Sequence, residues 1–140
     1  LESLYRALAF QRVLLVLQDV NTRSYMARLG FGAGIDEFMQ GFCFPGRYSN
    51  DVFHAVLKNN VDLHIDDVCD RKVQERIPDW YKALVPAGSF LLFPLVVNGR
   101  PLGLIYADHP TPQGISLGSG QLNLLKALRN QVVLAFRARG

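Results

Sequence analysis

Two apolar runs within residues 89–109 predict a β-hairpin at the centre of the fold. They flank Asn98-Gly99, a dipeptide that readily adopts the positive φ angles of a two-residue type I′ turn. Nearly every position in both runs is apolar, and successive side chains of a strand point to opposite faces. Both strands are therefore expected to lie inside a sheet that other elements cover on both faces.

The turn also predicts which residues of the hairpin face each other. With Val97 opposite Arg100, these pairs share one face: Leu95 with Leu102, Phe93 with Leu104, and Leu91 with Tyr106. The small residues Gly103 and Ala107 lie on the other face, where a helix could approach closely. We expect the face of Phe93 and Tyr106 to border a cavity, in which the Tyr106 hydroxyl would orient a small molecule. The alternative is a core tyrosine bonded to a neighbouring backbone group.

The rest of the pattern predicts an α+β arrangement around an antiparallel sheet. Gly30, Gly32 and Gly34 mark a loop, and no helix of suitable length opens on them to make a phosphate-binding fingerprint. Further strands are expected at residues 12–18, 24–29, 42–44 and 61–65. Helices are expected at residues 1–8, at 52–57 behind the capping residues Ser49, Asn50 and Asp51, as short turns between 71 and 84, and from Ser116 or Ser119 to Ala138.

The final helix is apolar over a wider arc than contact with one sheet requires. One stripe consists of Leu125, Leu128, Val132 and Ala135. A second set, Leu124, Ala127 and Leu134, extends the apolar surface sideways. We expect this second set to meet a partner helix, most simply in a homodimer.

Composition and charge exclude several classes of protein. The chain has 140 residues, enough for a single domain, which we expect to be a fragment of a longer protein because the sequence begins at Leu1. Hydrophobic residues make up 49% and charged residues 19%, as in a globular protein. The formal charge is only +3, and no aromatic residues are interleaved among the basic residues near the C-terminus. Nucleic-acid binding is therefore not expected. No apolar run reaches the ~18 residues of a membrane span. A cytoplasmic location with reduced cysteines is the default expectation.

The segment from Phe93 to Asp108, the strand and acidic loop from Val61 to Asp67, and the final helix around residues 124–135 together resemble a GAF domain. The resemblance covers essentially the whole chain. It implies a profilin-like central sheet of about five or six antiparallel strands, with terminal helices on one face and loops and short helices forming a cavity on the other. Residues 10–14 with 104–108 are more loosely similar to GAF domains that are joined to HDOD signalling domains in bacteria.

The family resemblance implies a noncatalytic sensor that binds a small molecule and regulates an attached output domain. The expected ligand-binding residues are Phe93, Tyr106, Phe42, Phe44, Phe53, Asp67, Arg71 and Trp80, with Phe90 as a further cavity candidate. The aromatic ones among them are also explained by plain core packing, and Asp67 and Arg71 by local capping and pairing. A second hypothesis is a GAF fold that is retained only for dimerisation through Leu124, Ala127 and Leu134. The ligand itself is not identified.

Metal binding and catalysis have little support in the sequence. His54, His64 and His109 and the two cysteines match no recognised ligand spacing, so no metal is expected. Some GAF domains resemble methionine sulfoxide reductases, a third hypothesis that requires several reactive cysteines. Here only Cys69 lies near the expected cavity, and Cys43 is expected to be buried between phenylalanines. Asn60 is followed by Val61, so the Asn-Lys pattern of cyclic-nucleotide-binding members is also missing.

Overall fold

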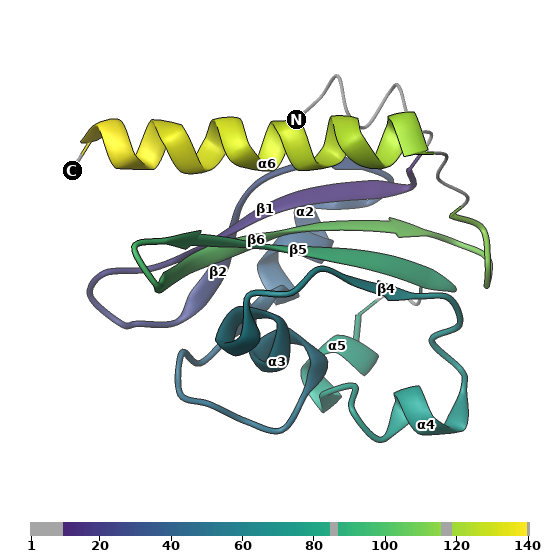
Figure 1. The fold of residues 1–140 in the computed structure, drawn as a ribbon. Helices are drawn as coiled ribbons and strands as arrows, with labels where there is room; N and C mark the ends of the chain where they lie inside the picture. The colour runs from purple at the N-terminus through teal and green to yellow at the C-terminus, as the bar shows by residue number, and fades with distance from the viewer. Residues whose placement is uncertain (1–9, 85–86, 116–118, 140) are drawn as a thin grey trace.

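A computed structural model describes residues 10–84, 87–115 and 119–139, and its centre is a six-stranded antiparallel sheet (Figure 1). The strands lie side by side in the order β3-β2-β1-β6-β5-β4. Their bounds are β1 (Arg12–Gln18), β2 (Tyr25–Gly32), β3 (Cys43–Phe44), β4 (Leu63–Ile65), β5 (Ser89–Val97) and β6 (Arg100–His109). The helices are α2 (Ile35–Gly41), α3 (Val52–Asn59), α4 (Arg71–Gln74), α5 (Asp79–Lys82) and α6 (Ser119–Arg139). The helix expected at residues 1–8 lies outside the described residues.

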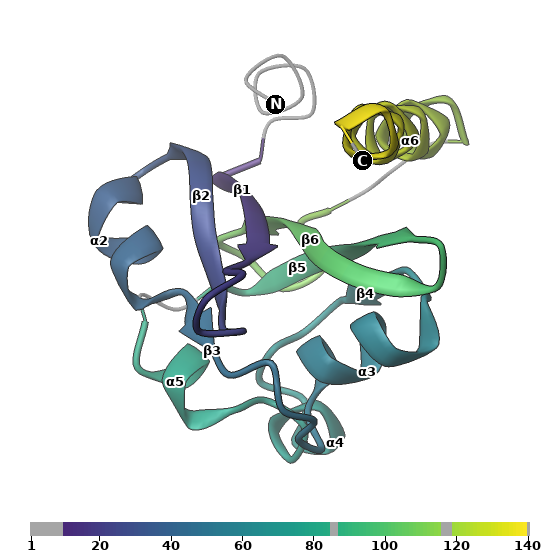
Figure 2. The same ribbon diagram turned by 90° about the vertical axis from the view of Figure 1, so that its left-hand side faces the viewer.

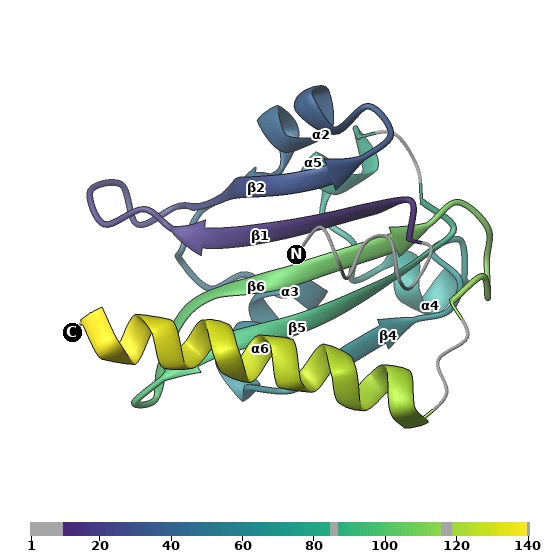
Figure 3. The same ribbon diagram turned by 90° about the horizontal axis from the view of Figure 1, so that it is seen from above.

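The sheet separates two hydrophobic clusters, as its two-sided apolar strands require (Figure 2). On one face, α6 runs across the sheet above β5, and Leu125 packs with Leu91 and Ile105 (Figure 3). On the other face lie α3, α4 and α5, with α2 packed against β2. The α+β fold class with a central antiparallel sheet is thereby confirmed. No helix among the described residues is both long and apolar enough to cross a membrane.

The central hairpin forms as expected at its turn but changes register two pairs later. Asn98 and Gly99 have φ angles of 53° and 77°, both positive as a type I′ turn requires. Val96 then pairs with Pro101 and Leu95 with Gly103, which leaves Leu102 as the extra residue of a β-bulge. Pro101 has no N–H for the ladder, and proline within a sheet favours such a bulge.

The bulge corrects the predicted assignment of faces. Phe93 pairs with Ile105 rather than with Leu104, and it packs in the cluster under α6. Tyr106 pairs with Leu92 and lies on the opposite face, where α3 and α5 pack. The assignment of Ala107 to the helix-covered face is confirmed, whereas the placement of Phe93 beside Tyr106 is wrong.

Local capping explains the helices on the second face, and one of them was missed. Asp51 caps α3: its Oδ1 accepts a hydrogen bond from the His54 backbone N–H at 2.9 Å. The expected edge strand is confirmed as β3, which pairs only with β2 among the described strands. In contrast, α2 occupies residues that the sequence analysis assigned to a loop, because its first cap is Gly34 in the left-handed region rather than a side-chain oxygen.

Gly103 of β6 leaves no room for a side chain against β1, and it provides a test of the sheet. A Cβ atom at this position would collide with the backbone carbonyl oxygen of Val16, so the two strands would have to separate. We predict that Gly103→Ala lowers the free energy of unfolding by about 1–3 kcal/mol, measured by urea denaturation. Gly120→Ala on α6 is the control, because a Cβ there meets no atom within 4 Å; it should be neutral or slightly stabilising. Equal effects of the two substitutions would contradict the prediction.

Candidate functional site

An aromatic cluster fills the space between the sheet and the helices α2, α3 and α5. Trp80 of α5 contacts three phenylalanines: its ring centroid is 4.9 Å from that of Phe53 and 5.0 Å from that of Phe42, and it stacks on Phe44 at 5.3 Å. Trp80 is half-buried, whereas the other rings are buried. The aromatic cluster consists of Phe38, Phe42, Phe44, Phe53, Trp80, Tyr81, Phe90 and Tyr106.

A chain of hydrogen bonds runs through this cluster. The Tyr81 and Tyr106 hydroxyl oxygens are 2.6 Å apart, and the Tyr106 hydroxyl donates to Asp108 Oδ2 at 2.6 Å. Arg12 of β1 completes the chain: its Nε donates to the same carboxylate oxygen at 2.9 Å, and its Nη2 lies 2.8 Å from it. We call Arg12, Asp108, Tyr106 and Tyr81 the polar chain.

Burial determines the protonation of both phenols in the polar chain. Burial raises the pKa of Tyr106 well above its ordinary value, and the nearby Tyr81 and Asp108 add to the rise. Burial likewise raises the pKa of Tyr81. Both hydroxyls therefore keep their protons at neutral pH. Since Tyr106 gives its single proton to Asp108, the proton between the two tyrosines must come from Tyr81.

The carboxylate of Asp108 is buried against an ion pair. Asp108 and Arg12 are 0% and 1% exposed, and the Arg12 guanidinium also lies 3.7 Å from the centroid of the Phe38 ring. Burial raises the pKa of Asp108, while the hydrogen bond from Tyr106 and the positive charge of Arg12 oppose that rise. Among the described residues, Asp108 Oδ1 has no hydrogen-bond partner although it is fully buried. An unpaired acceptor in such a place can bind a donor from a ligand.

The structure brings most of the predicted ligand-binding residues together. Phe42, Phe44, Phe53, Trp80 and Tyr106 all belong to the aromatic cluster, and so does Phe90. Phe93 does not, because it lies on the α6 face, 5.9 Å from the Arg129 guanidinium. Asp67 and Arg71 lie outside the cluster as well: Asp67 Oδ1 accepts from the Cys69 backbone N–H, and Arg71 is an exposed residue at the start of α4.

Sequence reasoning missed Arg12, Asp108 and Tyr81. One signal was present, because Tyr106 and Asp108 are two residues apart on a predicted strand and must share a face. The partnership of Asp108 with Arg12 depends on the pairing of β6 with β1, which the local pattern does not specify.

The predicted dimerisation residues and cysteines are on the surface. Leu124 and Leu134 of α6 are 51% and 58% exposed, and Ala127 is exposed. Cys43 was expected to be buried, but it is exposed because strand alternation turns it outward between the buried Phe42 and Phe44. Among the described residues, no three His, Cys, Asp or Glu side chains are grouped closely enough to hold a metal ion.

The helix α6 is joined to the layer on the opposite face by an ion pair. Arg129 of α6 pairs with Asp62, which lies between α3 and β4. A groove of about 350 Å³ beside this pair is lined by Asn60 and Val96, among others. Movement at the end of α3 can therefore reach α6 around the edge of the sheet.

The polar chain predicts an order of stability for two conservative substitutions. Tyr106→Phe removes a donor from Asp108 and leaves the buried Tyr81 hydroxyl without its acceptor, so it should cost about 1–3 kcal/mol of unfolding free energy. Tyr81→Phe leaves the Tyr106–Asp108 bond intact and should cost only about 0.5–1.5 kcal/mol. Urea denaturation of both variants at neutral pH tests the order. A larger loss for Tyr81→Phe would show that the chain does not run in the stated direction.

Comparison with solved structures shows the same fold at low sequence identity. Residues 122 to 287 of a methyl-accepting chemotaxis protein match with a TM-score of 0.78 and 23% identity, covering 98% of this chain and 84% of that one. The GAF domain of a phosphoenolpyruvate-protein phosphotransferase from Acinetobacter matches with a TM-score of 0.75 and 15% identity, over 99% and 80%. A type II free methionine-R-sulfoxide reductase from Thermoplasma acidophilum matches with a TM-score of 0.65 and 13% identity, over 94% and 83%.

Sequence comparison identifies the family directly. No curated protein matches the sequence. The model of the GAF domain family matches residues 1–136, which is almost the whole chain. The chain therefore belongs to the GAF domain family.

Proposed function

We propose that this GAF domain is a noncatalytic sensor module in which a small molecule binds at the polar chain and regulates an attached output domain. The observation that carries this proposal is the fully buried, unpaired Asp108 Oδ1, located in a core that is otherwise aromatic. Ligand sites typically combine apolar walls with a few converging polar groups. The expected ligand has a flat apolar body and at least one N–H or O–H donor.

Binding at this position requires α5 to move, since aromatic rings occupy the space. The helix α5 has only 4 residues, and its Tyr81 hydroxyl and Trp80 ring contact the sheet side of the cluster. A short helix has few internal hydrogen bonds to lose when it shifts. A ligand ring that enters as α5 shifts would recover the apolar contacts that Trp80 and Tyr81 give up, and its donor would satisfy Asp108.

The signal would reach the output domain through α6. The ion pair between Asp62 and Arg129 joins α6 to the layer that contains α3 and the aromatic cluster. Ligand contacts can shift α6 only if they favour one position of the segment 61–80 over another. An HDOD signalling domain in a cytoplasmic protein is one candidate for the output domain, because this chain loosely resembles GAF domains that are attached to such domains.

A noncatalytic role fits the chemistry of the site better than a reductase does. The aromatic cluster contains no cysteine, and Cys43 and Cys69 are free thiols on separate surface elements. Both phenols keep their protons, and Arg12 is paired with Asp108, so these groups are suited to hydrogen bonding rather than to nucleophilic attack.

Trp80 is the single tryptophan of the chain, and it provides a direct test of binding. We predict that a thermal-shift panel of nucleobases, aromatic amines and amino acids contains a compound that raises the melting temperature by at least about 2 °C, because ligands that bind only the folded state stabilise it. The same compound should shift the emission of Trp80. Asp108→Asn should weaken its binding about tenfold, since a charged acceptor is lost; binding is measured below the melting temperature of the variant, because Arg12 also loses its counter-charge.

The matched control is Asp70→Asn, which changes a carboxylate at the exposed cap of α4. It should bind the compound like the wild type. Stabilisation without any change in Trp80 emission would place the ligand elsewhere, and a panel without a binder would favour the dimerisation hypothesis.

The exposed surface of α6 favours homodimerisation as a second function. Leu124, Ala127, Gln131 and Leu134 are all exposed and follow one another at spacings of three, four and three residues, the pattern of a coiled-coil seam. Two copies of α6 could bury these leucines against each other. Such a dimer is compatible with a sensor function. Dimerisation alone would also explain why the fold is retained in a protein that binds no ligand.

We predict that Leu134→Glu weakens self-association at least about tenfold, because each dimer would bury two unpaired carboxylates. Sedimentation equilibrium of the wild type and the variant measures the change. Asn21→Glu adds the same charge at an exposed position on the turn between β1 and β2, outside α6, and should leave association unchanged. A wild-type protein that sediments as a monomer at its highest soluble concentration would eliminate the dimer.

A further inference from the structure

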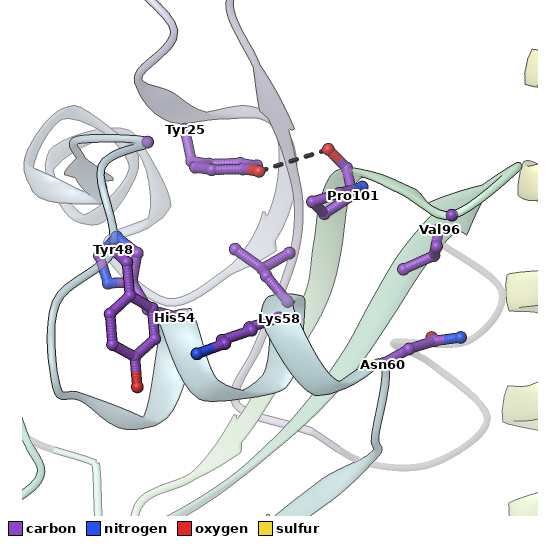
Figure 4. A pocket seen from close by; sticks show the side chains of 10 residues that line it. Tyr25, Tyr48, His54, Lys58, Asn60, Val96 and Pro101 are labelled. Atoms are coloured by element: carbon purple, nitrogen blue, oxygen red, sulfur yellow. Dashed lines mark hydrogen bonds between the residues drawn. The ribbon is translucent and has the colours of Figure 1, made fainter.

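A second concave surface lies between α3 and the tip of the β5–β6 hairpin, apart from the aromatic cluster (Figure 4). This surface, the α3 groove, has a volume of about 660 Å³, within the usual size range of small-molecule sites. None of its lining residues belongs to the aromatic cluster. On one side Tyr48, His54 and Lys58 line it, and on the other the hairpin residues Val96 and Pro101.

The wall formed by α3 and its preceding loop is held in place by a buried histidine. His54 is 6% exposed; its Nδ1 lies 2.8 Å from Asp51 Oδ2 and its Nε2 lies 2.8 Å from the Pro45 carbonyl oxygen. Burial alone would lower the pKa of His54, but the hydrogen bonds to Asp51 and Pro45 and the charge of Asp51 together raise it. The protonated ring can donate to both acceptors at once and tie the loop to α3.

The charged residues that line the groove are all basic. Asp51 neutralises His54, so the net charge of the groove comes from Lys58. Among the described residues Lys58 has no carboxylate partner, and its Nζ lies 4.6 Å from the centroid of the Tyr48 ring. An ammonium group without a carboxylate partner in a concave surface attracts anions.

The apolar part of the groove lining is suited to a flat apolar body. The Tyr48 ring is 53% exposed, and it lies across the groove from the hairpin with its Val96 and Pro101. The Tyr25 hydroxyl donates to the Pro101 carbonyl oxygen at 3.3 Å and fixes the inner end. Asn60 follows α3 with a φ of 52°, and its side chain extends away from Lys58, on the Val96 side of the groove.

We propose that the α3 groove binds a small aromatic anion, whose carboxylate or phosphate is held by Lys58 and whose ring packs on Tyr48. This site lies outside the aromatic cluster and goes beyond the sensor function proposed above. A carboxylate and a phosphate both offer negatively charged oxygens to Lys58. Separate probes, one for each group, distinguish them.

Nuclear magnetic resonance titration of the ¹⁵N-labelled chain tests the proposal with two matched pairs of probes. The first pair is 4-hydroxybenzoate and the neutral 4-hydroxybenzamide, and the second is adenosine monophosphate and adenosine. At least one anion should produce saturable shifts of the Tyr48, Lys58 and Asn60 amides, and its neutral partner should bind about fivefold or more weakly. Which anion binds tells carboxylate from phosphate recognition.

Lys58→Gln should weaken binding of that anion by about fivefold or more and remove its dependence on salt. Lys72→Gln, on the exposed surface of α4 outside the groove, is the control and should bind like the wild type. The proposal is overturned if neither anion gives saturable shifts at the groove, if the neutral partner binds as tightly, or if Lys58→Gln has no effect. Shifts confined to Trp80 and Tyr106 would assign the anion to the aromatic cluster instead.

Discussion

The ion pair between Arg12 and Asp108 constrains the rest of this domain. The two residues are direct partners on adjacent central strands, and both are almost completely buried. A buried pair contributes little net stability, yet loss of one partner costs about 3–5 kcal/mol because the other charge remains without compensation. The surrounding groups are therefore arranged to satisfy it: Tyr106 donates to the carboxylate, and the Phe38 ring faces the guanidinium. Pairing of β1 with β6 in any other register would separate these charges in an apolar core.

The sequence predicted the fold well where the signals were local. Asn98-Gly99 marked the hairpin turn, Asp51 marked the start of α3, and two-sided apolar strands indicated a covered sheet. The register failed because a bulge at Leu102 depends on how Pro101 fits between neighbouring strands. A one-residue slip exchanges the faces, so this single feature placed Phe93 beside the wrong cluster. Helix α2 was missed because it starts at a glycine without a side-chain cap.

The candidate site could be predicted only in its apolar part. Aromatic residues scattered from Phe42 to Tyr106 were expected to converge, and all of them except Phe93 do. Their spacing gives no information on whether they line an open cavity or pack against one another, because that depends on side-chain conformations throughout the core. The polar chain was less accessible still. Arg12 comes from β1, Tyr81 from α5, and the other two members from β6. Only the close approach of these elements brings Arg12 to the Asp108 carboxylate and Tyr81 to the Tyr106 hydroxyl.

The two proposed binding regions differ in how they can influence α6. The α3 groove and the smaller groove beside Arg129 are both lined by Asn60 and Val96, and Asp62 follows two residues later and pairs with Arg129. An anion held at Lys58 would therefore act within a few residues of the contact with α6. A ligand in the aromatic cluster would act through α5 and α3, a longer route. Any such influence requires two arrangements of the segment 60–62 that the ligand binds unequally, because a ligand with equal affinity for both shifts nothing. Asn60 itself has a left-handed backbone, at a φ of 52°, which asparagine tolerates better than most residues, so the direction of the chain after α3 depends on this residue.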